Sequence, residues 1–230
     1  MFTPESNYRV FKKLVPGIML RGMKINKVHP ERLPPAGPLI LICNHRSPLD
    51  ALVVSSVINR YISWVVADYN LEVFWNRWLF QATGMIPVSV SGAVDKKSVK
   101  LMAAVLKSQQ ILGVFPEGQQ YIFQGDYSQG SYQFQTGFAH MALKFQVPVL
   151  PCILKPITEK LAPLKVPDSL RKKLEQEHRV TLPKEQVTYQ QVELQMGKVV
   201  TPEIFVKHNK RWLVDHCWKV MNEMWLGAGD

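Results

Sequence analysis

The residues best suited to chemistry gather in a short polar loop, residues 44–50, which follows an apolar, strand-like run at residues 38–43. His45 and Asp50 lie five residues apart in this loop. A carboxylate that holds one nitrogen of an imidazole orients the ring and leaves the other nitrogen to take a proton. The pair is therefore a candidate general base, and the preceding strand would fix its position.

A second polar segment, residues 115–118, reads Phe-Pro-Glu-Gly and ends another apolar run at residues 111–115. Open parallel α/β sheets bind their ligands outside the carboxyl ends of the strands. His45 follows one predicted strand and Glu117 follows another. Together they predict a substrate site at one edge of such a sheet.

These segments resemble the glycerolipid acyltransferase family, whose members move a fatty acyl chain from a thioester onto a lipid hydroxyl. The family's first block is Asn-His, four residues and then Asp or Glu, and it is matched by Asn44, His45 and Asp50. Its third block is Phe-Pro-Glu-Gly, matched at residues 115–118. Weaker matches lie at residues 84–88, 147–151 and 192–202, so order and spacing agree from about residue 28 to residue 155.

The resemblance implies an O-acyltransferase of the lysophosphatidate or glycerol-3-phosphate type, acting in phospholipid biosynthesis. It makes His45 the general base and Asp50 the holder of its tautomer, so that the lipid hydroxyl attacks the thioester directly, without a covalent acyl-enzyme. The donor is acyl-CoA or an acyl carrier protein, and the chemistry needs no metal and no cofactor. The residues expected around the acceptor are Asn44, Arg46, Glu117, Gly118, Gln119 and Gln120.

Several residues of these loops also admit structural roles. Ser47 and Pro48 are typical of a helix start, so Asp50 could simply close a capping box. Glu117 could cap a helix or pair with Arg46, and the glycine after it would allow a close backbone approach. Backbone N–H groups at the same helix start are candidate donors to the oxyanion of the reaction.

The chain departs from the family at two arginines that are taken to hold the acceptor's phosphate. The first slot falls on Ser89 or Val90, and the usual Thr-Arg after the third block is Gln119-Gln120. Losing two charged hydrogen bonds of roughly 1.5–3 kcal/mol each would weaken phosphate binding about 10²- to 10⁴-fold. Three nearby lysines are possible substitutes: Lys96, Lys97 and Lys100. The alternatives are a non-phosphorylated acceptor, such as a glycolipid or other lipid alcohol, and a non-catalytic lipid-binding relative.

Length and composition fit one domain with a sizeable core, since 47% of the 230 residues are hydrophobic. The sequence has no run of 18 apolar residues and no signal-peptide pattern. Its three cysteines, Cys43, Cys152 and Cys217, have no metal-ligand spacing and fit buried thiols in a reducing compartment. We therefore expect a cytoplasmic protein.

The net charge of +10 is concentrated near the N-terminus, where six basic residues among the first thirty face only Glu5. Read as a helix that Pro16 would kink, this part carries an apolar stripe at Val10, Phe11, Leu14, Val15, Ile18 and Met19. Residues 1–27 are thus predicted to be an amphipathic segment on an anionic membrane surface. Ordinary solvated charge is the alternative, and the absence of a recognisable nucleic-acid-binding motif argues against DNA or RNA as a partner.

Strands alternate with helices along the chain, which favours a largely parallel sheet covered by helices on both faces. Residues 28–230 are predicted to form this single α/β acyltransferase domain. The predicted strands are at residues 23–28, 39–43, 63–67, 85–90, 111–115, 147–154 and 191–196. The predicted helices are at residues 51–58, 71–83, 95–109 and 137–145 and at the C-terminus.

Three further segments carry less regular patterns. Residues 71–83 place Phe74, Trp75 and Trp78 on one stripe, which fits either core packing or contact with an acyl chain or bilayer. Residues 119–135 are expected to form an irregular loop over the site. Residues 158–191 are expected to be an exposed insertion, helical near residues 169–177.

Overall fold

The computed structural model describes residues 17–69, 84–89, 95–118, 133–178 and 181–227 of the chain. The predicted helix at residues 71–83, most of the loop at residues 119–135 and the first 16 residues of the amphipathic segment lie outside these ranges. So do Gln119 and Gln120.

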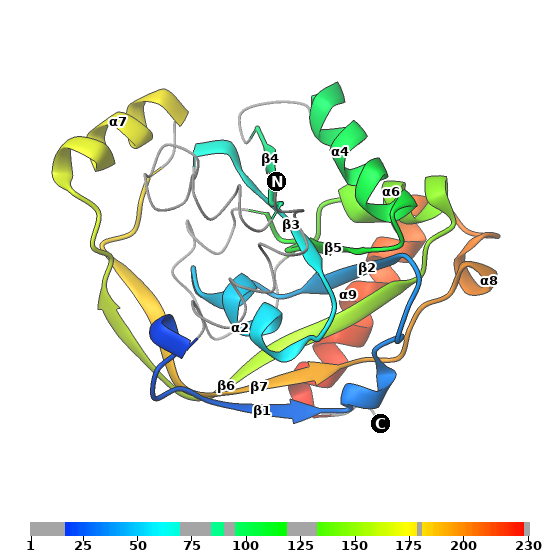
Figure 1. The fold of residues 1–230 in the computed structure, drawn as a ribbon, viewed down its shortest axis with the longest axis horizontal. Helices are drawn as coiled ribbons and strands as arrows, with labels where there is room; N and C mark the ends of the chain where they lie inside the picture. Colours follow the sequence, from blue (N-terminus) through cyan, green and yellow to red (C-terminus); the bar gives the residue numbers. More distant parts are fainter. Residues whose placement is uncertain (1–16, 70–83, 90–94, 119–132, 179–180, 228–230) are drawn as a thin grey trace, which may run out of the picture.

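The described residues form one α/β domain built on a seven-stranded sheet with the order β1-β7-β6-β2-β5-β3-β4 (Figure 1). Every ladder is parallel except the one between β6 and β7, which is antiparallel. This confirms the predicted fold class. The strands are β1 (Lys24–Val28), β2 (Leu39–Cys43), β3 (Ile62–Ala67), β4 (Ile86–Val88), β5 (Ile111–Val114), β6 (Val149–Pro163) and β7 (Glu185–Met196).

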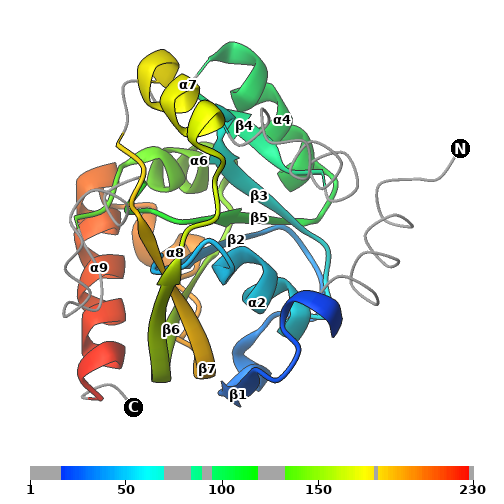
Figure 2. The same ribbon diagram turned by 90° about the vertical axis from the view of Figure 1, so that its left-hand side faces the viewer.

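Helices cover both faces of the sheet, with α2 on one side and α9 on the other (Figure 2). The helices are η1 (Pro30–Arg32), α2 (Asp50–Val57), α4 (Lys96–Lys107), α6 (Gly137–Phe145), α7 (Asp168–His178), α8 (Pro202–Phe205) and α9 (Lys210–Leu226). No helix in the described ranges is long and apolar enough to cross a membrane.

Strand β2 shows why the two helical layers form. All five of its residues are buried. Leu39, Leu41 and Cys43 belong to the core beneath α2, whereas Ile40 and Ile42 belong to the core beneath α4, α6 and α9. Side chains of a strand alternate between its faces, so an unbroken apolar run needs cover on both sides.

The structure differs from the expectation of an exposed insertion at residues 158–191. Strand β6 continues to Pro163 and β7 already begins at Glu185, so the two strands extend as an antiparallel pair. Val187 and Tyr189, on the inner face of this pair, are buried. The segment looked like an insertion because the outer face of a two-stranded ribbon is exposed and polar, which hides the strand pattern.

We call residues 158–178 and 181–191 the arm. Its helix α7, predicted at residues 169–177, packs through Leu174 on Tyr69, just beyond the end of β3. In the sheet, β2 and β5 lie between β6 and β3. The arm therefore passes across the carboxyl ends of β2 and β5, where the predicted site residues follow (Figures 1 and 2).

Gly113 in β5 permits the packing below that site. A Cβ atom at this position would lie 2.6 Å from the ring of Trp64 and 2.8 Å from Cγ2 of Ile62. Contacts this short are not tolerated by packed side chains, so the indole can occupy its place only if residue 113 has no side chain.

We predict that Gly113→Ala lowers the free energy of unfolding by about 1–3 kcal/mol, because the indole and its neighbours must shift. Gly137→Ala, at the start of α6 with nothing within 4 Å of the added methyl, should leave stability equal or slightly raised. Urea denaturation of both variants measures the difference. Equal stabilities would contradict the packing described for Trp64.

Candidate active site

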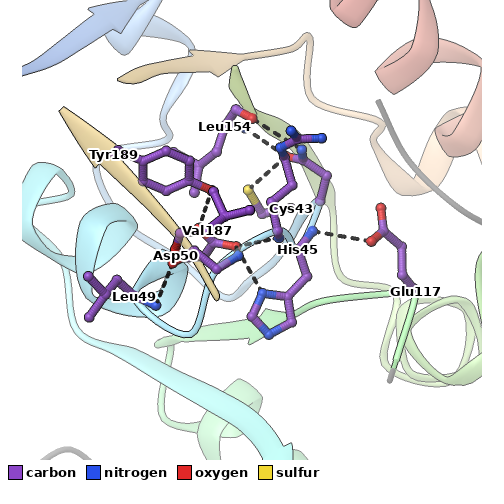
Figure 3. Close-up of polar contacts among 11 residues, drawn as sticks. Cys43, His45, Leu49, Asp50, Glu117, Leu154, Val187 and Tyr189 are labelled. Carbon is purple, nitrogen blue, oxygen red and sulfur yellow. Dashed lines mark hydrogen bonds and ion pairs between the residues drawn. The ribbon is translucent and has the colours of Figure 1, made fainter. Parts of the chain in front are cut away.

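His45 and Asp50 lie in contact at the carboxyl end of β2 (Figure 3). His45 Nδ1 is 2.9 Å from Asp50 Oδ2, and the side chains are 15% and 0% exposed. An ionised carboxylate only accepts hydrogen bonds, so Nδ1 carries the proton and donates it. Nε2 is then the basic nitrogen of the ring.

The carboxylate of Asp50 also accepts bonds from three other donors. Oδ2 accepts the backbone N–H groups of Arg46 at 2.6 Å and Ser47 at 2.8 Å. Oδ1 accepts the phenol O–H of Tyr189 at 2.8 Å. The capping interaction with Ser47 and the contact with His45 are therefore not alternatives, since one carboxylate makes both.

The backbone of this loop differs from the expectation that it supplies oxyanion donors. Throughout residues 45–50, all of which the structure describes, each N–H group is engaged and Pro48 has none. The acceptors are Glu117 for His45, Asp50 for Arg46 and Ser47, and the hydroxyl and carbonyl of Ser47 for Leu49 and Asp50. The Asp50 carboxylate accepts the N–H groups of Arg46 and Ser47, so these two groups cannot donate to a substrate oxyanion.

The ring of His45 is held by stacking as well. It lies on the ring of Phe115, with centroids 4.0 Å apart and planes at 14°. Phe115 in turn stacks on Trp64 at 4.6 Å and 10°. The indole Nε1 donates to Ser55 Oγ at 2.9 Å. Stacking fixes the plane of the imidazole and the Asp50 bond fixes its rotation, so the direction of Nε2 is set.

Glu117 and Gly118 connect the two loops. Glu117 is 1% exposed, and its Oε2 accepts the backbone N–H of His45 at 3.3 Å. Gly118 has a φ of 67°, in the left-handed region, while a Cβ there would meet only Gln135 Cγ, at 3.7 Å. The left-handed turn therefore favours a glycine here, and a close approach of its backbone to the acceptor stays a prediction.

Asn44 and Arg46 are predicted to face the acceptor, but in the structure their side chains form hydrogen bonds to other residues of the protein. The amide of Asn44 is fully buried, accepting from Leu154 N at 2.7 Å and donating to Leu154 O at 3.1 Å. Arg46 is 5% exposed, binds both carboxylate oxygens of Glu159 at 2.8 and 3.1 Å, and lies 5.2 Å over the ring of Trp225. In this arrangement both residues brace the loop.

Two groups in and directly before the described loop, Cys43 and Ser47, could act as nucleophiles, and both are already engaged. Cys43 is buried, which raises the pKa of its thiol well above the ordinary value, and its Sγ donates to Asn44 Oδ1 at 3.6 Å. Ser47 donates its hydroxyl to Val187 O at 2.7 Å. Neither group contacts the imidazole in an arrangement suited to covalent catalysis.

Three residues of the site were missed from the sequence: Glu159, Tyr189 and Trp225. They come from the arm and from α9, and 139 positions separate Tyr189 from Asp50. No local motif links such distant residues. The alternation of Val187 and Tyr189 could have indicated a strand, but not its partner.

Comparison with known proteins agrees with the family resemblance. The model of the family described as Acyltransferase matches residues 24–155. A probable 1-acyl-sn-glycerol-3-phosphate acyltransferase of Mycoplasma genitalium is 26% identical over 162 residues, covering 65% of this chain and 56% of the relative. The alpha form of 1-acyl-sn-glycerol-3-phosphate acyltransferase of Ovis aries is 27% identical over 143 residues, covering 59% and 46%. The chain thus spans about half the length of these curated relatives.

A similar fold has been solved by crystallography. The 1-acyl-sn-glycerophosphate acyltransferase PlsC of Thermotoga maritima superposes with a TM-score of 0.67, covering 97% of this chain and 80% of that one. Sequence identity is 14%, so this likeness is one of fold.

We predict that Asn44→Ala destabilises the protein by about 2–4 kcal/mol, because it leaves a buried N–H and a buried carbonyl of Leu154 without their partner. Asn209→Ala removes an exposed cap, where the side chain accepts from Trp212 N at 2.9 Å, and should cost about 1 kcal/mol. Urea denaturation of the two variants makes the comparison. A smaller loss for Asn44→Ala than for Asn209→Ala would refute the bracing role.

Proposed function

The chain belongs to the acyltransferase family, whose model covers more than half of it, and on that premise we propose that it transfers a fatty acyl group from a thioester to the hydroxyl of a lysophosphatidate-like lipid. The acceptor class is taken from the relatives named for 1-acyl-sn-glycerol-3-phosphate. The observation that carries the proposal is the 2.9 Å contact between His45 Nδ1 and the buried carboxylate of Asp50. The donor is acyl-CoA or an acyl carrier protein, and the proposal includes no metal or cofactor.

The reaction proceeds through direct attack. His45 Nε2 takes the proton of the lipid hydroxyl as its oxygen bonds to the thioester carbon, and the carbonyl becomes an oxyanion. The C–S bond then breaks, the ester remains on the lipid, and the leaving thiolate receives the proton from the imidazolium. Asp50 stabilises that imidazolium and holds the tautomer that begins the cycle.

A preorganised base suits this reaction for a physical reason. General-base catalysis typically contributes 10²- to 10⁴-fold when the proton acceptor is correctly placed. Here the strand end, the Phe115 ring and the Asp50 carboxylate each restrict the imidazole. Little ordering of the base is then required when the acceptor binds.

We further propose that the protein works at a membrane surface on the cytoplasmic side. The lipid acceptor resides there, and the excess of basic residues in the first thirty positions suits anionic headgroups. At the described end of that segment, Ile18 and Met19 are 76% and 52% exposed. Each nearby Lys or Arg contributes about 1 kcal/mol on an anionic bilayer.

His45→Ala should lower the rate of thioester consumption in the presence of lysophosphatidate by about 10²- to 10⁴-fold, because the proton of the hydroxyl loses its acceptor. His140→Ala, which removes an exposed histidine of α6, should keep the wild-type rate. A thiol-release assay with acyl-CoA and acyl carrier protein measures both variants. Equal rates for His45→Ala and wild type would discard the base, and a wild-type protein that binds lipid without consuming thioester would be a binding module.

The acceptor itself is tested with matched lipids. Gln119 and Gln120 stand where the family has Thr-Arg, and neutral amides suit hydroxyls better than phosphate, which favours a lipid alcohol as the second candidate. If lysophosphatidate is the acceptor, kcat/KM with it should exceed that with monoacylglycerol by at least about tenfold, the effect of one charged hydrogen bond. The reverse preference would assign the enzyme to a non-phosphorylated acceptor.

A further inference from the structure

The arm places the phenol of Tyr189 in contact with Asp50, the carboxylate that binds the proposed base His45. Tyr189 lies on the inner face of β7 and is 5% exposed. Its O–H is 2.8 Å from Asp50 Oδ1, while the other oxygen, Oδ2, faces His45 Nδ1 (Figure 3). The phenol and the imidazole therefore share one carboxylate, one on each oxygen.

The phenol can act only as a donor in this place. Burial, reinforced by the negative charge of Asp50, raises the pKa of Tyr189 well above its ordinary value, so the hydroxyl keeps its proton at neutral pH. A donor on Oδ1 draws negative charge away from Oδ2. That weakens the hold of the carboxylate on a protonated imidazole.

We infer that Tyr189 is a positioning residue that orients Asp50 and sets the proton affinity of His45. The inference rests on the proposed function, in which His45 must be neutral to take a proton. It adds a residue from outside the segment that the family model matches, which ends at residue 155.

Other charged or ionisable groups face the same loop, and each has contacts of its own. Arg46 is paired with Glu159 of the arm at 2.8 Å. Glu117, from the loop after β5, accepts the backbone N–H of His45. The thiol of Cys43, which precedes the loop, is held neutral by burial, which raises its pKa. A change confined to the Tyr189 hydroxyl therefore reports on the bond to Asp50.

The direction of the effect is fixed by electrostatics. In Tyr189→Phe the carboxylate regains charge on Oδ2 and binds the imidazolium more tightly. We expect the proton affinity of His45 to rise about three- to tenfold, the scale of one hydrogen bond to a charged group. The acidic limb of the rate profile then moves to higher pH, so the loss in kcat is large at low pH and shrinks as pH rises, while KM stays within about twofold.

The experiment is an NMR titration of the histidine ring carbons in the full chain, with the His45 signal assigned from its loss in His45→Ala. Wild type, Tyr189→Phe and Tyr61→Phe are compared, and kcat and KM are measured over the same pH range. Tyr61 is the matched control, since it directly precedes β3 and so lies at the amino end of a strand, whereas the site lies at the carboxyl ends. Urea denaturation verifies that each variant is folded.

Replacing Tyr189 with a ring-fluorinated tyrosine gives a second test that retains the hydroxyl. Its phenol is a stronger donor, so the proton affinity of His45 should fall below that of wild type. This substitution keeps the contacts of the aromatic ring and serves even if the phenylalanine variant is poorly folded.

A raised His45 pKa in Tyr189→Phe alone supports the inference. An unchanged or lowered pKa, or an equal rise in Tyr61→Phe, overturns it and leaves Tyr189 a purely structural contact. A wild-type protein that transfers no acyl group would refute the proposed function instead, while the titration still decides whether Tyr189 governs His45.

Discussion

The buried carboxylate of Asp50 is the constraint on which the site depends. A charge without exposure is costly unless hydrogen bonds replace the lost water. Four donors meet this carboxylate: the ring of His45, the amides of Arg46 and Ser47, and the phenol of Tyr189. The same requirement shapes the loop after β2, removes its amides from contact with a ligand, and ties the arm to the end of the sheet.

The sequence predicted the elements whose pattern is local. Strand β2 and helix α6 have the predicted bounds. The first is an apolar run between a proline-rich turn and polar residues, and the second is an amphipathic stretch between turns. Both patterns can be recognised without knowing any contact to distant residues. The pairing of His45 with Asp50 was also accessible, since five positions separate them. The arm could not be predicted in the same way. Its two strands are held together by the ladder between β6 and β7, and their many exposed polar residues obscure the strand pattern in the sequence. Tyr189 and Glu159 reach the site only through that ladder.

Two residues of the family blocks show that the fold can give a motif residue a structural task that its position in the sequence does not indicate. Asn44 belongs to the family block, yet its amide continues the pairing of β2 with β6 by bonding both backbone groups of Leu154. Gly118 belongs to the other block, yet the left-handed turn accounts for it. Residue type and spacing were sufficient to predict that the loops after β2 and β5 come together. Assigning each role required knowing which neighbours the fold provides.

The sheet order links the beginning of the described chain to its last strand. β1 pairs with β7, and β7 alone joins it to β6 and the rest of the sheet. During synthesis on a ribosome, β1 is made long before its partner, and β6 presents an open edge until β7 arrives. Open strand edges invite association with other chains. Until residue 196 has emerged from the ribosome, β1 and β6 therefore lack the strand that joins them. Their open edges can associate with other chains throughout this stage.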